Sequence, residues 1–410
     1  MEYGLIGKSL SHSFSPEIHR EIGNYKYELK ELSSNELPGF FSERNFKGIN
    51  VTIPYKETVI PFLDGISDEA KAIGSVNTVI NENGKLFGYN TDFYGLSSLI
   101  KQSGISLRGK SVLVLGTGGT SKTAACVSEK LGAKSILKVS RNGNGDISYK
   151  EAYEKYSDTD IIINTTPCGM SPNIAETPVE LKKFRKLSGV IDAIYNPIDT
   201  NLVCEAKKLG IPCSGGLYML VSQAVKSAEL FGFVPKKSTE DIYIKLLKEK
   251  QNIVLTGMPS SGKTTVGKIL SEKLGMEFFD ADTEIEKATG KSIPEIFSEN
   301  GEEFFRAAES AIIAKKLALL NGAVIATGGG AVLSEENMKR LSQNGKIYFL
   351  DRPKELLFPT SDRPTASSSE KIEELYYKRI ELYKKYSDIT IDASKEAGET
   401  AAFITEDFLK

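Results

Sequence analysis

The sequence predicts an α/β protein in which short buried strands alternate with helices and pair into largely parallel sheets. Apolar runs such as 110–116 and 160–166 are separated by stretches of helical spacing, which is typical of parallel strands joined by crossover helices. Two glycine-rich loops, at 116–121 and 257–264, each follow such a strand and open a helix. The chain is 40% hydrophobic and 26% charged, so we expect a globular core rather than a disordered or fibrous chain.

Length and composition narrow the class of protein. The 410 residues suffice for two to three domains, at roughly 150 residues for each. Lysine and arginine total 52 against 54 acidic residues, and the net charge of −2 argues against a nucleic-acid binder. We find no signal peptide and no apolar run near the roughly 18 residues of a membrane span, so no membrane partner is expected. Cys126, Cys168, Cys204 and Cys213 lack metal-binding spacing and are typical of reduced thiols, which predicts a cytoplasmic protein.

The expected elements follow from local patterns along the chain. In residues 2–98, apolar runs bounded by turn residues predict strands and amphipathic stretches predict helices. The expected strands there are 3–7, 25–32, 48–53 and 77–80, and the expected helices are 15–23 and 68–74. From residue 110 the pattern becomes regular, with strands at 110–116, 135–141, 160–166 and 189–195, and helices at 123–133, 217–232 and 239–250.

The same order begins again at Asn252. Strands are expected at 252–257, 277–282, 323–329 and 346–351, with helices at 263–275 and 371–386. The stretch 352–369 is rich in Pro, Ser and Thr, which is typical of a loop that covers a site.

The second glycine loop carries the most specific motif. Residues 257–264 fit GxxxxGK[ST] in full, between a predicted strand and a predicted helix. Glycines let backbone N–H groups approach phosphates, and the helix N-terminus adds a favourable dipole. Lys263 suits the β- and γ-phosphates of a nucleotide, and Thr264 suits Mg²⁺. A plain glycine turn fits this context less well, but the loop alone does not distinguish a kinase from a switch or a motor.

Three further motifs follow this loop. Asp280 and Asp282 stand two residues apart at a predicted strand end, where one carboxylate could serve a metal and the other an attacking hydroxyl. Arg306 and Glu309 share a helix face, which taken alone is typical of a surface ion pair. Glycines at 328–330 follow a strand and admit close approach of a ligand. A solvated acidic turn and a plain loop are the alternatives for the first and third motifs.

This order of motifs resembles the shikimate kinase family over about residues 251–410. The motifs are the phosphate loop, the DxD pair, GEEFFR at 301–306, the glycines, a loop with Arg-Pro and a late arginine. The resemblance implies that Asp280 lies near Mg²⁺ with Thr264, and that Asp282 meets the reacting hydroxyl. The implied ATP contacts are Gly257, Ser260, Ser261, Gly262, Lys263, Thr264 and Thr265.

The same resemblance implies the shikimate contacts. Arg306 and Arg379 would hold the carboxylate, because a planar guanidinium matches its two oxygens. Gly329 and Gly330 would line the substrate, and Arg363 would close over substrate and phosphate. The family usually has a second arginine in this loop, but residues 356–360 read LLFPT, so nucleotide affinity or loop closure is expected to differ.

The first glycine loop, GTGGTS at 116–121, is a loose dinucleotide fingerprint, because Ser121 stands in place of the third glycine. A structural tight turn explains the loop alone equally well. NAD sites place an acidic residue at the end of the second strand, but here Arg141 follows that strand and no acid comes before Asp146. A cation at this point suits a 2′-phosphate and favours NADP, with a solvent-exposed arginine as the alternative.

Polar residues interrupt the apolar segments upstream of this loop. Lys56 follows a strand and a proline turn, Asn77 ends a short segment, and Asp92 follows a hairpin-like stretch. A paired lysine and aspartate can share a proton role, with the carboxylate orienting the ammonium. Each residue also has a plain structural interpretation as an ion pair or a turn cap. His12 and His19 are the only histidines, so histidine acid–base chemistry has few candidates.

This half of the chain resembles the shikimate dehydrogenase family over about residues 3–248. The motifs that carry the resemblance are SHSFSP, GINVTIPYK, IGSVNT, GYNTD, GTGGTSK, NTTPCGM, DAIYNP and GGLYMLVSQA. It implies that Lys56 and Asp92 form the catalytic pair. The implied substrate contacts are Ser13, Ser15, Thr52, Asn77, Tyr195 and Gln223, and the implied NADP contacts are Gly116, Gly118, Gly119, Arg141, Thr165, Gly216 and Met219.

Together the resemblances imply a bifunctional enzyme that reduces 3-dehydroshikimate to shikimate with NADPH and phosphorylates shikimate with ATP and Mg²⁺. The implied fold is a substrate domain, 1–98 with 219–249, around a Rossmann NADP domain, 99–218, followed by a P-loop kinase domain, 250–410. Two alternatives remain open: a quinate- or NAD-using dehydrogenase joined to the kinase, and a ligand-sensing regulatory protein with an inactive module. The sequence makes no prediction of oligomeric state.

Overall fold

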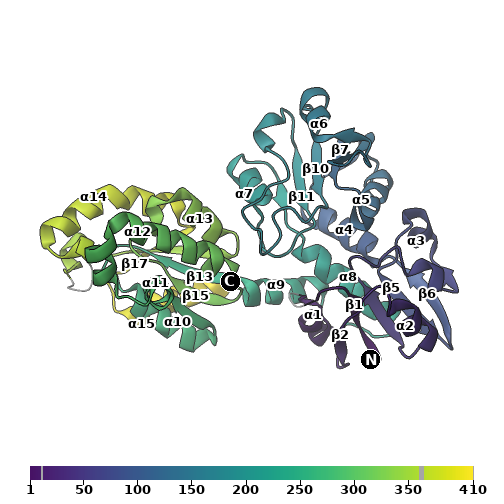
Figure 1. Ribbon diagram of the computed structural model, residues 1–410, viewed down its shortest axis with the longest axis horizontal. Coiled ribbons are helices and arrows are strands. Elements are labelled where there is room, and N and C mark those ends of the chain that lie inside the picture. Colours follow the sequence, from purple (N-terminus) through teal and green to yellow (C-terminus); the bar gives the residue numbers. More distant parts are fainter. Residues whose placement is uncertain (11–12, 360–363, 410) are drawn as a thin grey trace. The chain divides into compact units, whose positions relative to one another are not determined.

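The computed structural model describes residues 1–10, 13–359 and 364–409, and the chain divides into two compact units, Met1–Leu246 and Leu247–Lys410 (Figure 1). The described residues form three sheets, of which two belong to the first unit and one to the second. The predicted α/β class is therefore confirmed. No helix within the described ranges is long and apolar enough to cross a bilayer.

The first sheet of unit 1 is mixed. Its elements are β1 (Tyr3–Gly7), β2 (Tyr27–Glu31), β3 (Gly48–Val51), β4 (Gly65–Ile66), β5 (Thr78–Glu82), β6 (Lys85–Tyr89), α1 (Ser15–Ile22), α2 (Leu37–Glu43) and α3 (Asp68–Ile73). The strand order is β2-β1-β3-β5-β6-β4, with β1 parallel to β2 and β3 but β5 antiparallel to β3 and β6. Ile49 and Val51 belong to one buried cluster with Phe41 of α2 and Ala70 of α3, so these helices cover one face.

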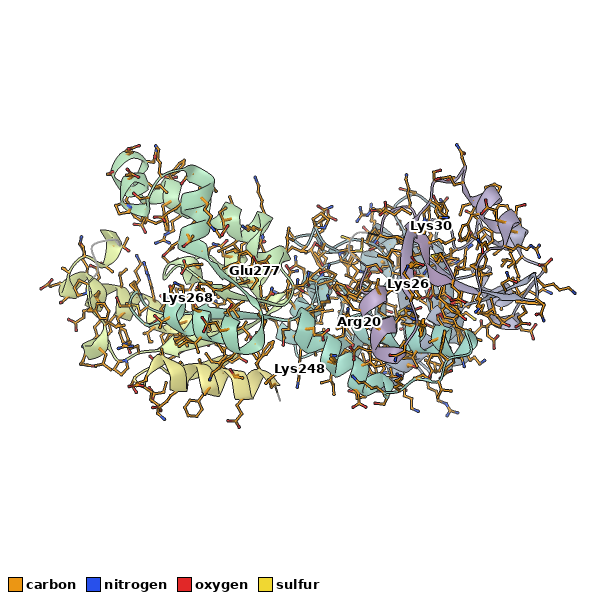
Figure 2. The ribbon with its side chains drawn as sticks, turned by 90° about the horizontal axis from the view of Figure 1, so that it is seen from below. Arg20, Lys26, Lys30, Lys248, Lys268 and Glu277 are labelled. Atoms are coloured by element: carbon orange, nitrogen blue, oxygen red, sulfur yellow. The ribbon has the colours of Figure 1, made fainter. Side chains whose placement is uncertain are left out.

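Strand β2 forms one edge of this sheet. Lys30 on the strand and Lys26 just before it are exposed, as is Arg20 of α1 (Figure 2). Charged side chains at a sheet edge disfavour pairing with a strand of another molecule.

The second sheet of unit 1 is parallel throughout. Its strands are β7 (Ser111–Leu115), β8 (Ser135–Ser140), β9 (Ile147–Ser148), β10 (Ile161–Asn164), β11 (Gly189–Asp192) and β12 (Cys213–Ser214), and the helices of this region are α4 (Thr91–Gln102), α5 (Gly119–Lys130), α6 (Tyr149–Lys155), α7 (Asn201–Lys208), α8 (Leu217–Leu230) and α9 (Thr239–Lys250). The order is β12-β11-β10-β7-β8-β9. Val112 and Val114 pack with α4, α5 and α8, whereas Leu113 and Leu115 pack with α6 and α7, because successive strand residues face opposite sides.

Unit 2 is a single parallel sheet between two layers of helices. Its elements are β13 (Asn252–Thr256), β14 (Glu277–Asp280), β15 (Ala323–Ala326), β16 (Gly345–Asp351), β17 (Ile389–Asp392), α10 (Lys263–Leu274), α11 (Ala281–Thr289), α12 (Ile293–Lys315), α13 (Glu335–Ser342), α14 (Ser369–Tyr386) and α15 (Ala397–Leu409). The order is β14-β15-β13-β16-β17. Tyr348 and Leu350 belong to a cluster with α10 and α15, whereas Phe349 stacks on Tyr383 of α14, with ring centroids 5.1 Å apart.

Local structure departs from the expectations in several places. Helix α2 has no counterpart among the expected elements, because its seven residues include Pro38 and Gly39 and show little periodicity. Helices α4, α6, α7, α13 and α15 were not among the expected elements either. Strand β14 ends at Asp280 rather than continuing to Asp282, because the Asp280 carboxylate accepts a hydrogen bond from the N–H of Asp282 at 3.0 Å and caps α11. The two aspartates therefore lie on a cap and a first helical turn, not along one strand.

Candidate active sites

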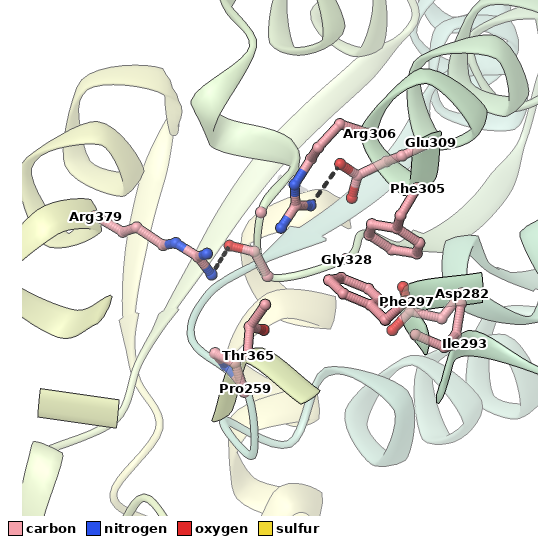
Figure 3. Close-up of a pocket in the computed structure, with 12 residues that line it drawn as sticks. Pro259, Asp282, Ile293, Phe297, Phe305, Arg306, Glu309, Gly328, Thr365 and Arg379 are labelled. Carbon is pink, nitrogen blue, oxygen red and sulfur yellow. Dashed lines mark hydrogen bonds and ion pairs between the residues drawn. The ribbon is translucent and has the colours of Figure 1, made fainter. Parts of the chain in front are cut away.

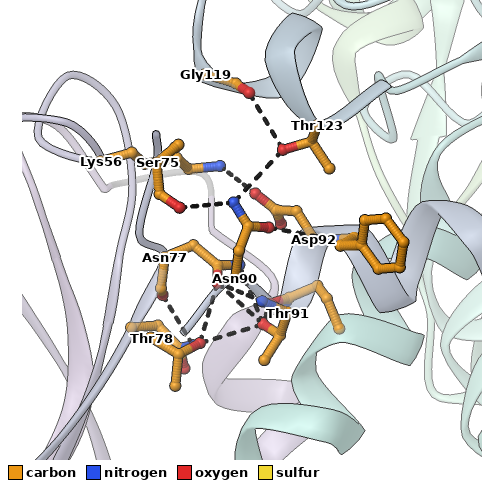
Figure 4. Close-up of polar contacts among 12 residues, drawn as sticks. Lys56, Ser75, Asn77, Thr78, Asn90, Thr91, Asp92, Gly119 and Thr123 are labelled. Atoms are coloured by element: carbon orange, nitrogen blue, oxygen red, sulfur yellow. Dashed lines mark hydrogen bonds and ion pairs between the residues drawn. The ribbon is translucent and has the colours of Figure 1, made fainter. Parts of the chain in front are cut away.

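Lys56 and Asp92 form an ion pair in unit 1, with Nζ 2.6 Å from Oδ2 (Figure 4). Lys56 lies beyond the end of β3, and Asp92 lies in the first turn of α4, which Asn90 caps by accepting a hydrogen bond from Phe93 N–H. The two side chains are only 15% and 9% exposed, so water weakens their attraction less than at the surface. The pair presents an oriented ammonium group that can donate a proton.

Asn90 connects this pair to the first glycine loop. Its Nδ2 donates to the backbone oxygen of Ser75 at 2.9 Å and lies 3.5 Å from Oγ1 of Thr123, which donates to the carbonyl of Gly119 at 3.2 Å (Figure 4). A Cβ placed on Gly119 would lie 3.7 Å from Cδ of Lys56. The loop and the ion pair therefore belong to one site.

Asn77 and Gln223 are brought together by Thr91, the first residue of α4. The N–H of Thr91 donates to Oδ1 of Asn77 at 2.7 Å, and Nδ2 of Asn77 donates to Oγ1 of Thr91 at 3.0 Å. Oγ1 of Thr91 also lies within hydrogen-bond distance, 3.3 Å, of Oε1 of Gln223 on α8. A Cβ on Gly95 would lie 2.6 Å from the carbonyl of Met219, so the absence of a side chain there lets α4 and α8 approach closely.

The serine segment near the N-terminus lies beside Tyr195. Oγ of Ser13 donates to Oγ of Ser15 at 3.2 Å, and the ring of Phe14 packs on Tyr195 with centroids 5.3 Å apart. Burial raises the pKa of Tyr195, so its hydroxyl remains a hydrogen-bond donor. Thr52 lies just after β3, and a Cβ on Gly7 would lie 2.6 Å from its methyl group.

The first glycine loop has the open backbone that a dinucleotide needs. Gly116 has φ 110°, in the left-handed region that favours glycine, and no described atom lies within 4 Å of a Cβ placed on Gly118. Ser121 donates to the carbonyl of Gly116 at 2.6 Å, so its hydroxyl closes the loop where the third glycine is missing. Thr165 lies against the same loop, because its Oγ1 donates to the carbonyl of Leu115 at 2.6 Å.

The remaining residues assigned to NADP follow other strands of the same parallel sheet or lie on α8. Arg141 is exposed directly after β8, with its guanidinium 5.9 Å from the ring centre of Tyr149. Gly216 caps α8, and a Cβ there would lie 2.2 Å from the carbonyl of Ala193, so only glycine fits. Met219 is buried one turn further along α8. A cation after β8 and an open loop fit a dinucleotide that carries a 2′-phosphate.

A buried carboxylate that was not predicted from the sequence, that of Asp192, ends β11 of this sheet. Asp192 accepts hydrogen bonds from Asn164 Nδ2 at 3.0 Å, Ile194 N–H at 3.0 Å and Thr200 Oγ1 at 2.7 Å, and burial raises its pKa to about 7. Asn164 in turn accepts from Thr166, which orders the turn that carries Thr165. The available signal was an Asn and an Asp that end two neighbouring apolar strands.

The histidines contribute no proton carrier near neutral pH among the described residues. His19 is fully buried in α1, where burial lowers its pKa to about 3, and Nδ1 lies 2.5 Å from the hydroxyl of Tyr25. His12 lies outside the described residues.

In unit 2 the phosphate loop joins β13 to α10. Gly257 and Gly262 have φ of 149° and 93°, and Nζ of Lys263 donates to the carbonyls of Gly257 and Met258 at 2.9 and 2.8 Å. Lys263 is thus held over the loop whose backbone N–H groups can receive phosphates. Ser261 is buried in this loop, and Thr265 is exposed on the first turn of α10.

The assigned metal residues contact each other. Oγ1 of Thr264 donates to Oδ2 of Asp280 at 2.8 Å. One hydroxyl and one carboxylate suit Mg²⁺, which usually takes its other ligands from water and substrate phosphates. Within the described ranges no group of three or more His, Cys, Asp or Glu side chains could hold a metal by itself.

The described first part of the loop predicted to cover this site, residues 352–359, contacts the phosphate loop. Oγ of Ser260 donates to the carbonyl of Phe358 at 2.7 Å, and Arg352 Nε donates to the carbonyl of Leu356 at 3.2 Å. Arg363 lies outside the described residues.

A pocket beside the phosphate loop collects the other predicted kinase residues (Figure 3). Asp282, Arg306, Gly329, Gly330 and Arg379 all line it. The pocket is also lined by residues that the sequence analysis did not assign, namely Pro259, Ile293, Phe297, Phe305, Glu309, Gly328 and Thr365.

The arginines of this pocket lie against its glycines. Nη1 of Arg379 donates to the carbonyl of Gly329 at 3.0 Å, while its Nε has no hydrogen-bond partner among the described residues. A Cβ on Gly330 would lie 2.1 Å from Nη1 of Arg306, so the guanidinium lies where any other residue would put a side chain. Two guanidinium groups facing one pocket suit a carboxylate ligand.

The spacing of Arg306 and Glu309 alone is typical of a surface ion pair, but in the structure Glu309 is buried. Its side chain is 2% exposed and accepts a hydrogen bond from Arg306 Nη1 at 2.8 Å (Figure 3). Burial raises the pKa of Glu309, although the charge of Arg306 opposes this. The other partner of Arg306, Glu302, is 54% exposed. Arg306 therefore forms one ion pair with a buried carboxylate and one with a solvated carboxylate, both from α12.

Comparison with known proteins gives matches in both units. A family model described as the shikimate dehydrogenase substrate binding domain matches residues 5–79, and a model described as shikimate kinase matches residues 259–408. A Clostridium perfringens protein named shikimate dehydrogenase (NADP(+)) is 39% identical over 270 residues, which cover 60% of this chain and 97% of that protein.

Two solved structures are similar to this chain. Shikimate dehydrogenase 1 from Peptoclostridium difficile has a TM-score of 0.56 at 36% identity, and the match covers 60% of this chain and 98% of that one. Shikimate 5-dehydrogenase from Thermus thermophilus, solved with NADP(H) and shikimate, has a TM-score of 0.54 at 29% identity, and the match covers 59% and 97%.

Proposed function

We infer that this chain, which belongs to the shikimate dehydrogenase family and carries a shikimate kinase domain, is a bifunctional enzyme of the shikimate pathway. Its first unit reduces 3-dehydroshikimate to shikimate with NADPH, and its second transfers the γ-phosphoryl group of ATP to the 3-hydroxyl of shikimate. One observation carries this function. A buried Lys56–Asp92 pair beside a dinucleotide loop, and a phosphate loop beside an arginine-lined pocket, occur in one chain.

In the dehydrogenase reaction, NADPH supplies the hydride that reduces the ring carbonyl. Lys56 donates a proton to the carbonyl oxygen as negative charge develops on it, and Asp92 orients the ammonium group. Asn77 and Gln223 bind ring hydroxyls, which their shared contact with Thr91 supports.

The other assigned residues complete the dehydrogenase site. Ser13 and Ser15 bind the substrate carboxylate beside Tyr195, and Thr52 binds a ring hydroxyl. NADP rather than NAD is favoured, because Arg141 stands where an NAD site carries an acid. The glycine loop with Thr165, Gly216 and Met219 receives the cofactor.

In the kinase reaction, ATP bound with Mg²⁺ supplies the phosphoryl group. Lys263 neutralises phosphate charge, and Thr264 with Asp280 holds the metal ion. Asp282 accepts the proton of the attacking hydroxyl, which its place in the pocket beside the phosphate loop supports.

Arg306 and Arg379 hold the shikimate carboxylate, and Arg363 closes over the substrate. The free Nε of Arg379, which has no partner among the described groups, supports a ligand at that point. We propose three domains: residues 1–98 with 219–249 for substrate, 99–218 for NADP, and 250–410 for the kinase.

A coupled assay on the intact chain tests this function. With 3-dehydroshikimate, NADPH and MgATP, we expect NADPH oxidation and formation of shikimate 3-phosphate. Without ATP the product is free shikimate, and with shikimate in place of 3-dehydroshikimate the kinase runs alone. Absence of turnover despite ligand binding would support a regulatory protein instead. Faster oxidation of quinate with NAD than of shikimate with NADP would support the other alternative.

A further inference from the structure

A buried hydroxyl, that of Ser227, lies at the centre of a polar network behind the dehydrogenase site. Ser227 is one helical turn after Gln223 on α8 and is fully buried. Its Oγ donates to the backbone carbonyl of Gln223 at 2.9 Å and accepts from Nδ2 of Asn50 at 2.8 Å. The same atom lies 3.0 Å from Oγ1 of Thr91 and 3.1 Å from Oγ1 of Thr78. One hydroxyl therefore joins α8 to α4, β3 and β5.

Tyr27 sets the direction of these hydrogen bonds. Its hydroxyl donates to Oδ1 of Asn50 at 2.8 Å, and burial raises the pKa of Tyr27 well above its ordinary value, so the hydroxyl stays protonated. Because Asn50 uses its oxygen for Tyr27, its Nδ2 must face Ser227 as a donor. Ser227 Oγ accepts there, which leaves its own proton for the carbonyl of Gln223.

Thr91 connects Ser227 to the proposed substrate contacts. The single hydroxyl proton of Thr91 has four acceptors within reach: Ser227 Oγ at 3.0 Å, Thr78 Oγ1 at 3.1 Å, Asn77 Oδ1 at 3.2 Å and Gln223 Oε1 at 3.3 Å. Ser227 is the nearest of the four. Thr78 Oγ1 lies 3.1 Å from both Asn77 Oδ1 and Thr91 Oγ1. When Thr91 donates to Ser227 and Thr78 donates to Thr91, the amide oxygens of Asn77 and Gln223 keep an acceptor position for another ligand.

We propose that Ser227 is a positioning residue of the dehydrogenase, which keeps the proton of Thr91 off the amide oxygens of Asn77 and Gln223. Those oxygens then stay available to the ring hydroxyls of the substrate. Ser227 itself touches neither substrate nor cofactor. The proposal rests on the dehydrogenase function inferred above and adds a residue to it.

The test compares two serines of the same helix. Ser227→Ala should raise the KM of the dehydrogenase for shikimate about tenfold, which is the effect of losing about one hydrogen bond. The KM for NADP and the shikimate kinase activity should stay unchanged. Ser222→Ala is the matched control, because Ser222 is equally buried on α8 but its hydroxyl has no hydrogen-bond partner in the described part of the chain. It should leave both KM values unchanged.

A double-mutant cycle separates positioning from general loosening of the core. In an Asn77→Ala background, Ser227→Ala should raise the KM for shikimate less than about twofold, because the group it orients is gone. If Ser227→Ala fails to fold, Tyr27→Phe is the second test, because it alters the same network from β2. It should also raise the KM of the dehydrogenase for shikimate.

Equal effects of Ser227→Ala and Ser222→Ala, or full additivity with Asn77→Ala, would overturn the positioning role. A wild-type chain without NADP-dependent shikimate oxidation would instead overturn the proposed function, so the two failures are distinguishable.

Discussion

The ammonium of Lys56 lies 2.6 Å from the carboxylate of Asp92, although 36 residues separate them in the chain. Lys56 follows the strand β3, and Asp92 begins the helix α4, whose N-cap Asn90 also reaches the glycine loop through Thr123. One ion pair therefore stands where the first sheet, α4 and the dinucleotide loop meet. Substitutions at the dehydrogenase site can be tested one residue at a time. The kinase activity of the same preparation then serves as an internal control.

Lys56→Ala should abolish most of the NADPH-dependent reduction of 3-dehydroshikimate. The expected loss in kcat is about 10²- to 10⁴-fold, the usual contribution of a positioned proton donor. Shikimate-dependent ADP formation by the same preparation should be unchanged. Undiminished NADPH oxidation would show that Lys56 is not the proton donor.

Lys263→Ala should abolish shikimate-dependent ADP formation and leave the dehydrogenase intact, because Lys263 is the cation of the phosphate loop. Lys268→Ala is the matched control, since Lys268 is an exposed lysine on the same helix α10. Initial rates of both half-reactions give the measurement. Equal ADP formation by Lys263→Ala and wild type would contradict the kinase assignment.

Arg141→Gln should raise the KM for NADP by about tenfold or more, because a charged hydrogen bond to a phosphate contributes about 1.5–3 kcal/mol. The KM for NAD should not rise, since NAD lacks the 2′-phosphate. Lys134→Gln removes a charge just before β8, at the opposite end of the strand, and should change neither value. A parallel rise for both cofactors would mean that Arg141 acts on the fold instead.

Glu309→Gln should raise the KM of the kinase for shikimate about tenfold, since it weakens a buried hydrogen bond that orients Arg306. The KM for ATP should be unchanged. Glu302→Gln removes the exposed partner of the same arginine and should change the KM for shikimate by less than about twofold, because exposed pairs contribute little. Identical effects of the two substitutions would refute a special role of the buried carboxylate.

His19 should make the stability of unit 1 depend on pH. Its pKa falls from 6.5 to about 3 on folding, so between these values the unfolded chain binds a proton that the folded chain does not. The free energy of unfolding should therefore fall by about 1.4 kcal/mol for each pH unit as the pH drops below 6.5.

His19→Phe keeps a ring against Tyr27, on which His19 stacks with centroids 3.7 Å apart, and removes the titrating group. The difference in unfolding free energy between wild type and variant, from urea denaturation followed by circular dichroism, should shift by about 2 kcal/mol between pH 7 and pH 5. A difference that is constant over this range would show that His19 does not titrate as its burial requires.

Much of the fold could be predicted from the sequence, and the structure brings several of the candidate site residues close together. The strands around 111–115 and 252–256 and the loops that follow them are local patterns, in which glycine spacing and apolar runs specify the backbone. The pocket residues Arg306 and Arg379 were assigned through the resemblance, and they do line one pocket.

The residues that were missed depend on burial. Glu309 was expected on a surface, because helical spacing shows which residues share a face but not what covers that face. Asp192 at the end of β11 was not predicted to be buried, since two of its three donors, Asn164 and Thr200, come from other segments.

Local patterns in the chain were enough to mark two motif-bearing halves, and together with the resemblance to two families they predicted the class of cofactor at each glycine loop and the polar residues proposed to serve the two reactions. They did not show which of those polar groups meet, because that depends on long-range packing. Thr91 and Ser227 lie 136 residues apart, and their contact exists because α4 and α8 pack closely where Gly95 has no side chain. Neighbouring residues encode helices and loops, whereas the orientation of a buried amide such as Asn77 depends on hydrogen-bond partners that the folded chain brings together from distant segments.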